Sequence, residues 1–125
     1  MAEERGFLPQ AAVIEGYGQG GFRFADMSHR GSLLCLPSGM RAWGVTEPAG
    51  LSRETLEAVF LERERIDLLL LGTGRDVAFV PQALRWQFRD AGIGLDVMPT
   101  NAAIRTWNIL LGENRRVAAA LIAVP

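Results

Sequence analysis

The sequence contains no lysine, one cysteine and one histidine, and these shortages exclude several classes of site. All 13 basic residues are arginine, so a P-loop, which needs a lysine to contact the phosphates of a nucleotide, is excluded. The single cysteine, Cys35, cannot form an internal disulfide, which fits a reducing compartment. Because His29 has no second histidine and no cysteine cluster to join it, a zinc site is not expected.

Long apolar runs and a strong excess of charge are also missing. The longest apolar stretches, at residues 66–71 and 117–124, are far shorter than the roughly 20 residues that span a bilayer. The formal net charge is -1, which indicates no general attraction to nucleic acid. The opening segment MAEERGF combines acidic residues with no apolar core, unlike a secretory signal or a transit peptide. We therefore expect a cytoplasmic protein without a transmembrane segment.

The first third of the sequence favours an antiparallel meander at the start of a single domain. The chain has 125 residues, of which 49% are hydrophobic, and this suits one globular domain over residues 1–125. Apolar and polar residues alternate in GFRFADM, and SLLCLP and MRAWGVT are expected to be further strands. GYGQGG is predicted to be a glycine-rich connector, and SHRG and PSG are predicted to be turns.

Helices and strands alternate in the second half of the chain. Ser52 is a suitable N-cap for a first helix, Pro81 suits the start of a second, and Thr100 or Asn101 is expected to cap a third. The intervening segments RIDLLLLG, GIGLDVM and VAAALIAV are expected to be strands that pair in parallel through right-handed crossovers. The connection LGENRR is short, so an antiparallel last strand is the alternative. The fold class is therefore α/β, with a mixed central sheet, packed helices and the antiparallel meander.

The segment GTGR follows a buried strand and raises the question of a nucleotide-binding loop. A dinucleotide-binding fingerprint needs a glycine at its sixth position, where this chain has Val77, and its helix would begin earlier than Pro81. A Rossmann-type site is therefore disfavoured. The simplest interpretation is that Gly72 and Gly74 permit a sharp turn.

The alternative is a small pocket for an anion or a polar ligand. Two parallel strands would end at one rim of the sheet, where GTGR would face MPTN. The helix that follows offers free N–H groups and the positive end of its dipole, and Asn101, Arg105 and Asn108 form a polar stripe on it. The candidate ligand-binding residues are Gly72, Thr73, Gly74, Thr100, Asn101 and Arg105.

The remaining reactive or exposed side chains suggest no chemistry. Cys35 is expected to be a buried, inert thiol, and His29, placed in the predicted turn SHRG, has no nucleophile elbow to serve.

Trp86 lies away from the buried stripe of its helix, between Arg85 and Arg89, and these residue types are enriched at binding hot spots. These three residues are a candidate partner surface; the alternative is that Trp86 covers a neighbouring loop.

Four segments, which together span nearly the whole chain, resemble one known family. They are GYGQGGFRF, HRGSLLCLPSGMRAW, DLLLLGTGRDVAFVP and AGIGLDVMPTNAAIRTWNILLGENRRVAAALI. Their order is similar to that of small bacterial and archaeal proteins related to assembly factor 3 of mitochondrial respiratory complex I. The resemblance implies a three-layer α/β fold, no established catalytic activity or cofactor, and, for the mitochondrial branch of the family, a non-enzymatic assembly role through protein partners.

Two function hypotheses follow. The leading one is a protein-binding module without catalytic residues, metal or cofactor that helps assemble a respiratory membrane complex from the cytoplasmic side. Its partners would be subunits or assembly factors of that complex, and its contact surface would be either Trp86 with its two arginines or the GTG/MPTN edge. The alternative is a small-molecule or anion-binding protein, or a minor enzyme, that uses the pocket at the same edge.

Overall fold

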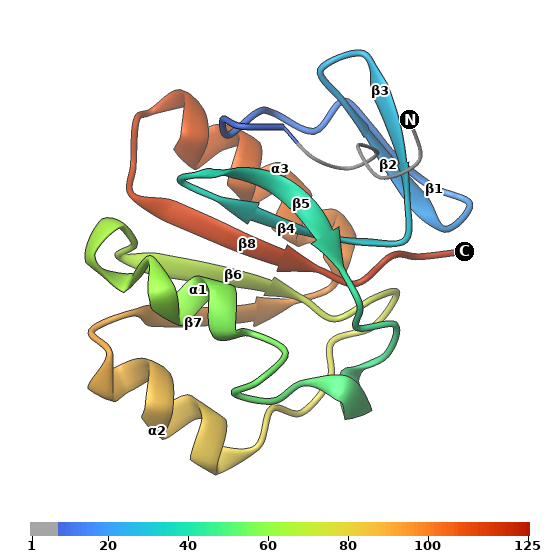
Figure 1. Cartoon of the computed structure of the whole chain (residues 1–125). Coiled ribbons are helices and arrows are strands. Elements are labelled where there is room, and N and C mark those ends of the chain that lie inside the picture. Colours follow the sequence, from blue (N-terminus) through green and yellow to red (C-terminus); the bar gives the residue numbers. More distant parts are fainter. Residues whose placement is uncertain (1–7) are drawn as a thin grey trace.

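A five-stranded mixed sheet forms the centre of the computed structural model, which describes residues 8–125 (Figure 1). In spatial order its strands are β5 (Gly39–Trp43), β4 (Ser32–Leu36), β8 (Val117–Leu121), β6 (Leu68–Gly72) and β7 (Gly94–Met98). Strand β6 is parallel to both β7 and β8, whereas β4 is antiparallel to β5 and β8. The predicted mixed sheet is confirmed. The prediction about MAEERGF lies outside the described residues.

The N-terminal sheet is a separate three-stranded antiparallel meander of β1 (Gly16–Gly18), β2 (Gly21–Phe24) and β3 (Met27–Arg30). Its second hairpin turns on Ala25 and Asp26, both at positive φ, which is the geometry of a two-residue hairpin loop. Three predictions were therefore wrong: GYGQGG contains strand β1, GFRFADM is divided by this turn between β2 and β3, and SHRG lies mostly in β3 rather than in a turn. The turn was missed because neither of its residues is glycine, the usual residue at positive φ.

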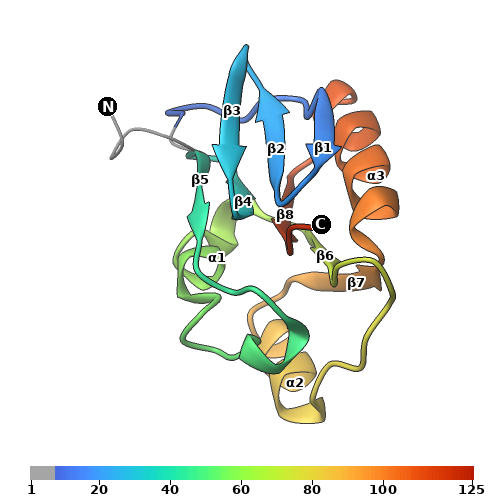
Figure 2. The same cartoon turned by 90° about the vertical axis from the view of Figure 1, so that its right-hand side faces the viewer.

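The layers follow from the apolar character of both faces of the central sheet. One face is covered by α1 (Glu57–Leu61) and α2 (Gln82–Asp90), and the other by α3 (Thr100–Gly112) and the N-terminal sheet (Figure 2). Along β6, Leu69 and Leu71 belong to the first core cluster and Leu70 to the second. Burial on both sides explains why this strand is apolar throughout.

The helix starts differ in detail from the sequence prediction. Ser52 accepts a hydrogen bond from the Thr55 N–H at 3.1 Å, but this caps a turn, and α1 begins only at Glu57. Pro81 is the N-cap of α2, close to its predicted place. The predicted caps of α3 were wrong, since Pro99 is the N-cap and no side chain caps this helix. Two short 3-10 helices, η2 (Pro48–Gly50) and η3 (Arg63–Arg65), flank α1.

The last strand settles the alternative that the sequence left open. Strand β8 runs parallel to β6 over its whole length, so the antiparallel alternative was wrong for this pair. The short LGENRR connection does not prevent this, because the 13 residues of α3 already carry the chain back along the sheet. Strand β8 is also antiparallel to β4 and so joins the two halves of the sheet.

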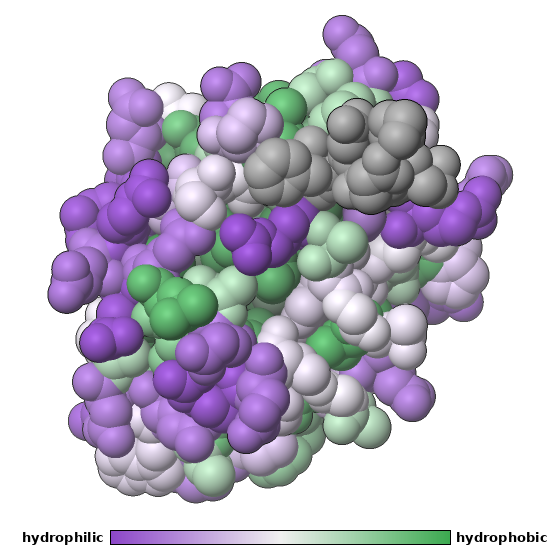
Figure 3. Space-filling view, in the orientation of Figure 1, coloured by the Kyte–Doolittle hydropathy of each residue, from purple (hydrophilic) through white to green (hydrophobic). Residues whose placement is uncertain are grey.

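Hydrophilic residues cover most of the face seen in Figure 3, with small apolar areas between them. Within residues 8–125, no helix is both long and apolar enough to cross a bilayer.

Candidate functional site

The ends of β6 and β7 bring GTGR beside MPTN, as the sequence predicted. The Thr73 N–H donates to the Met98 carbonyl at 3.0 Å, and the Thr100 N–H donates to the Gly74 carbonyl at 2.8 Å. Gly72 pairs with Met98 at the last position of the parallel ladder. The two strands therefore end at a common rim of the sheet.

Thr100 is fully buried and joins three segments at this rim. Its Oγ1 accepts a hydrogen bond from the Gly74 N–H at 2.9 Å and donates one to the Ile122 carbonyl at 2.7 Å. These bonds connect the loop after β6, the start of α3 and the chain after β8. A hydroxyl has one proton, so Thr100 has no donor left for a ligand.

The two residues at the end of β6 also have structural contacts. Thr73 is 4% exposed, and its Oγ1 donates to the Asp76 carbonyl at 2.7 Å. A Cβ at Gly72 would lie 3.0 Å from the Thr100 Cα, so a side chain there would crowd the start of α3 against the strand. Gly74 has a φ of +102°, a conformation in which glycine is favoured. This geometry supports the interpretation of GTG as a sharp turn.

A pocket of about 220 Å³ nevertheless opens at the rim and is lined by Tyr17, Gly74, Arg75, Asn101, Val124 and Pro125. Two of the six candidate ligand-binding residues, Gly74 and Asn101, line this pocket. Gly72, Thr73 and Thr100 are buried, and Arg105 is exposed on α3 without lining it. Sequence reasoning missed Tyr17, because this residue comes from β1 in the other sheet.

The polar residues of α3 do not act together: Asn108 forms hydrogen bonds within the fold, whereas Asn101 and Arg105 are exposed. Asn108 accepts a hydrogen bond from the Ile14 N–H at 2.8 Å and donates one to the Ile14 carbonyl at 2.9 Å. The neighbouring Trp107 donates from Nε1 to the Ala12 carbonyl at 2.9 Å. The segment before β1 is thus fastened to α3, whereas Asn101 remains exposed.

The α2 surface is defined here as Val77, Phe79, Arg85, Trp86 and Arg89. Phe79 is 80% exposed, Val77 60% and Trp86 49%. The Arg89 guanidinium lies 5.2 Å from the centroid of the Trp86 ring, and Arg85 donates from Nε to the Val80 carbonyl at 3.3 Å. The helical periodicity of the sequence showed that Trp86 lies off the buried face of α2. Phe79 comes before this helix, so periodicity could not show that its side chain is exposed.

Two side chains singled out by the sequence are buried. Cys35 is inaccessible, and burial raises the pKa of its thiol well above the ordinary value. His29, predicted in a turn, is instead 4% exposed in β3, and its Nε2 donates to the Ser32 carbonyl at 2.9 Å. Its Nδ1 has no hydrogen-bond partner within residues 8–125. Over the same residues, no three side chains of His, Cys, Asp or Glu gather as metal ligands would.

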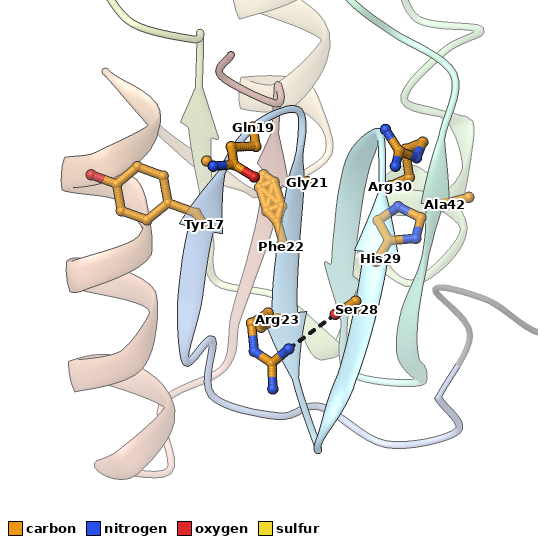
Figure 4. Close-up of a pocket in the computed structure, with 10 residues that line it drawn as sticks. Tyr17, Gln19, Gly21, Phe22, Arg23, Ser28, His29, Arg30 and Ala42 are labelled. Carbon is orange, nitrogen blue, oxygen red and sulfur yellow. Dashed lines mark hydrogen bonds between the residues drawn. The ribbon is translucent and has the colours of Figure 1, made fainter.

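A larger pocket, of about 1040 Å³, lies against the N-terminal sheet (Figure 4). Sequence reasoning did not propose it. Its described lining residues come from all three strands of that sheet, from the turn between β1 and β2, and from β5. They are Tyr17, Gly18, Gln19, Gly21, Phe22, Arg23, Ser28, His29, Arg30 and Ala42. Arginine supplies every charged side chain in this set.

Comparison with known proteins shows a family match and close relatives. The family described as "Protein of unknown function (DUF498/DUF598)" matches residues 14–122. An uncharacterized protein of Rhodobacter capsulatus is 37% identical, covering 100% of this chain and 95% of that protein. A Rhodopseudomonas palustris protein of known structure is 52% identical with a TM-score of 0.85, covering 95% of this chain and 88% of that one.

The relatives include a named assembly factor. NADH dehydrogenase (ubiquinone) 1 alpha subcomplex assembly factor 3 of Mus musculus is 31% identical over 94% of this chain. The chain covers 64% of the mouse protein, so it spans less than two thirds of that relative. The resemblance inferred from the sequence is thereby confirmed: the chain belongs to the DUF498/DUF598 family, together with assembly factor 3 and bacterial proteins of uncharacterized function.

Proposed function

We propose that this chain is a non-enzymatic protein-binding module that helps assemble a respiratory membrane complex, and that it contacts its partner through the α2 surface. The relationship to assembly factor 3, at 31% identity, supports this role. Because the chain spans less than two thirds of that relative, the proposal concerns what the shared domain contributes. A module of this kind needs no catalytic group and no cofactor.

The exposure of aromatic side chains on the α2 surface is the main support. Phe79 is 80% exposed and Trp86 49% exposed, although burying a large apolar side chain contributes roughly 1.5–3 kcal/mol. Arg89 lies over the Trp86 ring, and tryptophan and arginine are the residue types most enriched at interface hot spots. Neither Arg85 nor Arg89 forms an ion pair within residues 8–125.

The α2 surface is held in place by the opposite side of its helix. Leu84 and Phe88 are buried, and the Phe88 ring stacks on Phe60 with the ring centroids 4.5 Å apart. The helix that presents Trp86 is therefore anchored before any partner arrives. Less conformational entropy is lost on binding when a surface is already ordered.

The test compares partner capture by the wild type with capture by Phe79→Ala/Trp86→Ala. Ile109→Ala is the matched control, since Ile109 is 55% exposed but lies on α3. With the tagged protein expressed from its own gene, we expect one partner to be captured by the wild type and the control. The amount of partner captured by the double variant should be at least about tenfold lower, because hot-spot truncations cost about 2 kcal/mol or more of binding free energy.

Two outcomes would contradict the proposal. Full partner recovery by Phe79→Ala/Trp86→Ala would show that the α2 surface does not bind the partner. If deletion of the gene leaves the amount of assembled NADH dehydrogenase complex unchanged, the assembly role itself is refuted.

Binding of a small anion at the rim of the sheet is the second candidate function. Arg75 and Asn101 line the pocket of about 220 Å³ there, and they supply a cation and an amide. Thermal-shift measurements with phosphate, sulfate and small organic acids test this. A ligand at a hundred times its Kd adds about 2.7 kcal/mol of stability, and Arg75→Gln should abolish that gain. If no such anion stabilises the wild type, this candidate is excluded.

A further inference from the structure

The outer face of the N-terminal sheet presents two arginines above small residues. In the register of β2 and β3, Gly21 lies opposite Arg30, and Arg23 lies opposite Ser28. Residues two apart on one strand share a face, so these four line the same side of the sheet. Arg23, Ser28 and Arg30 are exposed, whereas the alternate residues of both strands face the core or are more buried. This is the face that borders the pocket of about 1040 Å³ in Figure 4.

The pocket is locally cationic on a chain whose formal net charge is -1. No aspartate or glutamate is among its described lining residues. Arg23 and Arg30 form no ion pair within residues 8–125. A guanidinium has five N–H donors, and among residues 8–125 the two side chains donate one hydrogen bond, from Arg23 to Ser28. An anionic ligand would therefore meet donors that the fold has not used.

The position of the two guanidinium groups suggests an extended ligand. Arg23 donates to the Ser28 Oγ at 3.1 Å, so its side chain leans across β2 towards β3 (Figure 4). One guanidinium thus lies at the level of Ser28, and the other belongs to Arg30, two residues further along β3. Two residues of a strand span about 6.6–6.8 Å. An extended peptide with carboxylates at positions i and i+2 has the same spacing, and arginine can hold each carboxylate through two parallel hydrogen bonds.

The free edge of β3 favours a peptide over a small anion. In the described part of the chain β3 pairs only with β2. Its two-residue hairpin makes Phe24 and Met27 a hydrogen-bonded pair, so the main-chain groups of Ser28 and Arg30 point away from β2. A peptide strand could pair with these groups, and its acidic side chains would then stand beside the arginines.

We propose that this pocket binds an extended acidic segment of a partner protein, which adds to the edge of β3 and pairs carboxylates two residues apart with Arg23 and Arg30. This site is separate from the α2 surface and does not depend on the proposed assembly role.

Fluorescence anisotropy with a labelled synthetic peptide of alternating glutamate and valine tests the proposal. The comparison peptide has glutamine in place of glutamate, and the comparison variants are Arg23→Gln/Arg30→Gln and Arg65→Gln/Arg115→Gln. The second pair removes the same charge from exposed side chains elsewhere. We expect the wild type to bind the acidic peptide, and Arg23→Gln/Arg30→Gln to bind it about tenfold more weakly, in line with the loss of two exposed ion pairs. The control variant should stay within about twofold.

Backbone amide NMR of the wild type gives a second readout that does not depend on the folding of any variant. Titration with the acidic peptide should shift the amides of Ser28 and Arg30, and the Phe79→Ala/Trp86→Ala variant should bind the peptide as the wild type does. Equal weakening by both arginine variants would indicate diffuse attraction and overturn the proposal. No binding, amide shifts confined to other parts of the chain, or competition by inorganic phosphate at the concentration of the peptide would also overturn it.

Discussion

Replacing Thr100 by valine tests whether the rim of the central sheet is a structural junction. Thr100 is fully buried, and its hydroxyl bonds to the Gly74 N–H at 2.9 Å and to the Ile122 carbonyl at 2.7 Å. Valine keeps the shape of the side chain but leaves both main-chain groups buried without a partner, at about 1–3 kcal/mol each. We expect the free energy of unfolding to fall by about 2–6 kcal/mol, out of the roughly 5–15 kcal/mol typical of a domain.

Urea unfolding followed by tryptophan fluorescence measures this change, because Trp43 and Trp107 are buried in the core. The control is the same exchange at Thr46, which is exposed and should change stability by less than about 0.5 kcal/mol. The denaturant slope should not change, because unfolding exposes the same surface in each variant. If Thr100→Val matches the control, the hydroxyl is no junction, and Thr100 becomes a candidate ligand donor again.

Two further changes probe the core. Asn108→Ala should lower the free energy of unfolding by about 2 kcal/mol, since two hydrogen bonds to Ile14 are lost; unaltered hydrogen exchange at the Ile14 amide would contradict the anchoring role. Burial raises the pKa of the Cys35 thiol, so above about pH 8.5 the unfolded chain loses this proton and the folded protein keeps it. Stability should therefore fall as the pH rises through this range, by up to about 1.4 kcal/mol per pH unit more than in Cys35→Ala. Urea titrations at pH 8 and pH 10 measure the difference, and parallel losses in both proteins would refute the assignment.

The second half of the fold could be predicted because its signals are local. The apolar run that contains β6 indicates burial on both faces, and the helices around it require parallel crossovers. From these two facts it follows that the chain leaves β6 and β7 at one rim. That rim was therefore placed correctly before any side-chain contact was known.

The N-terminal sheet shows where local signals fail. Ala25 and Asp26 adopt positive φ without glycine, so the chain turns three residues earlier than SHRG suggested. If the chain turned at SHRG, Arg30 would lie in the turn and not in a strand paired with the strand of Arg23. The two arginines would then not share one face of the sheet. Register decides which side chains meet, and it depends on pairing between strands, which periodicity within one strand cannot give.

The glycines in the two glycine-rich segments of the chain have structural roles. In a phosphate-binding loop the main-chain N–H groups point at the ligand, but the N–H groups of Thr73 and Gly74 bond to Met98 and Thr100 within the fold. The glycines of GTG are thus explained by the close approach of α3 and by the turn. In GYGQGG, Gly18 and Gly20 have φ of +125° and +81°, which glycine favours, and a Cβ at Gly21 would clash with the His29 carbonyl oxygen, so these glycines are explained by the turn between β1 and β2 and by the close pairing of β2 with β3. Within residues 8–125, Arg23 and Arg30 on the N-terminal sheet form no ion pair and donate only one side-chain hydrogen bond between them, so a search for ligands should begin at that sheet.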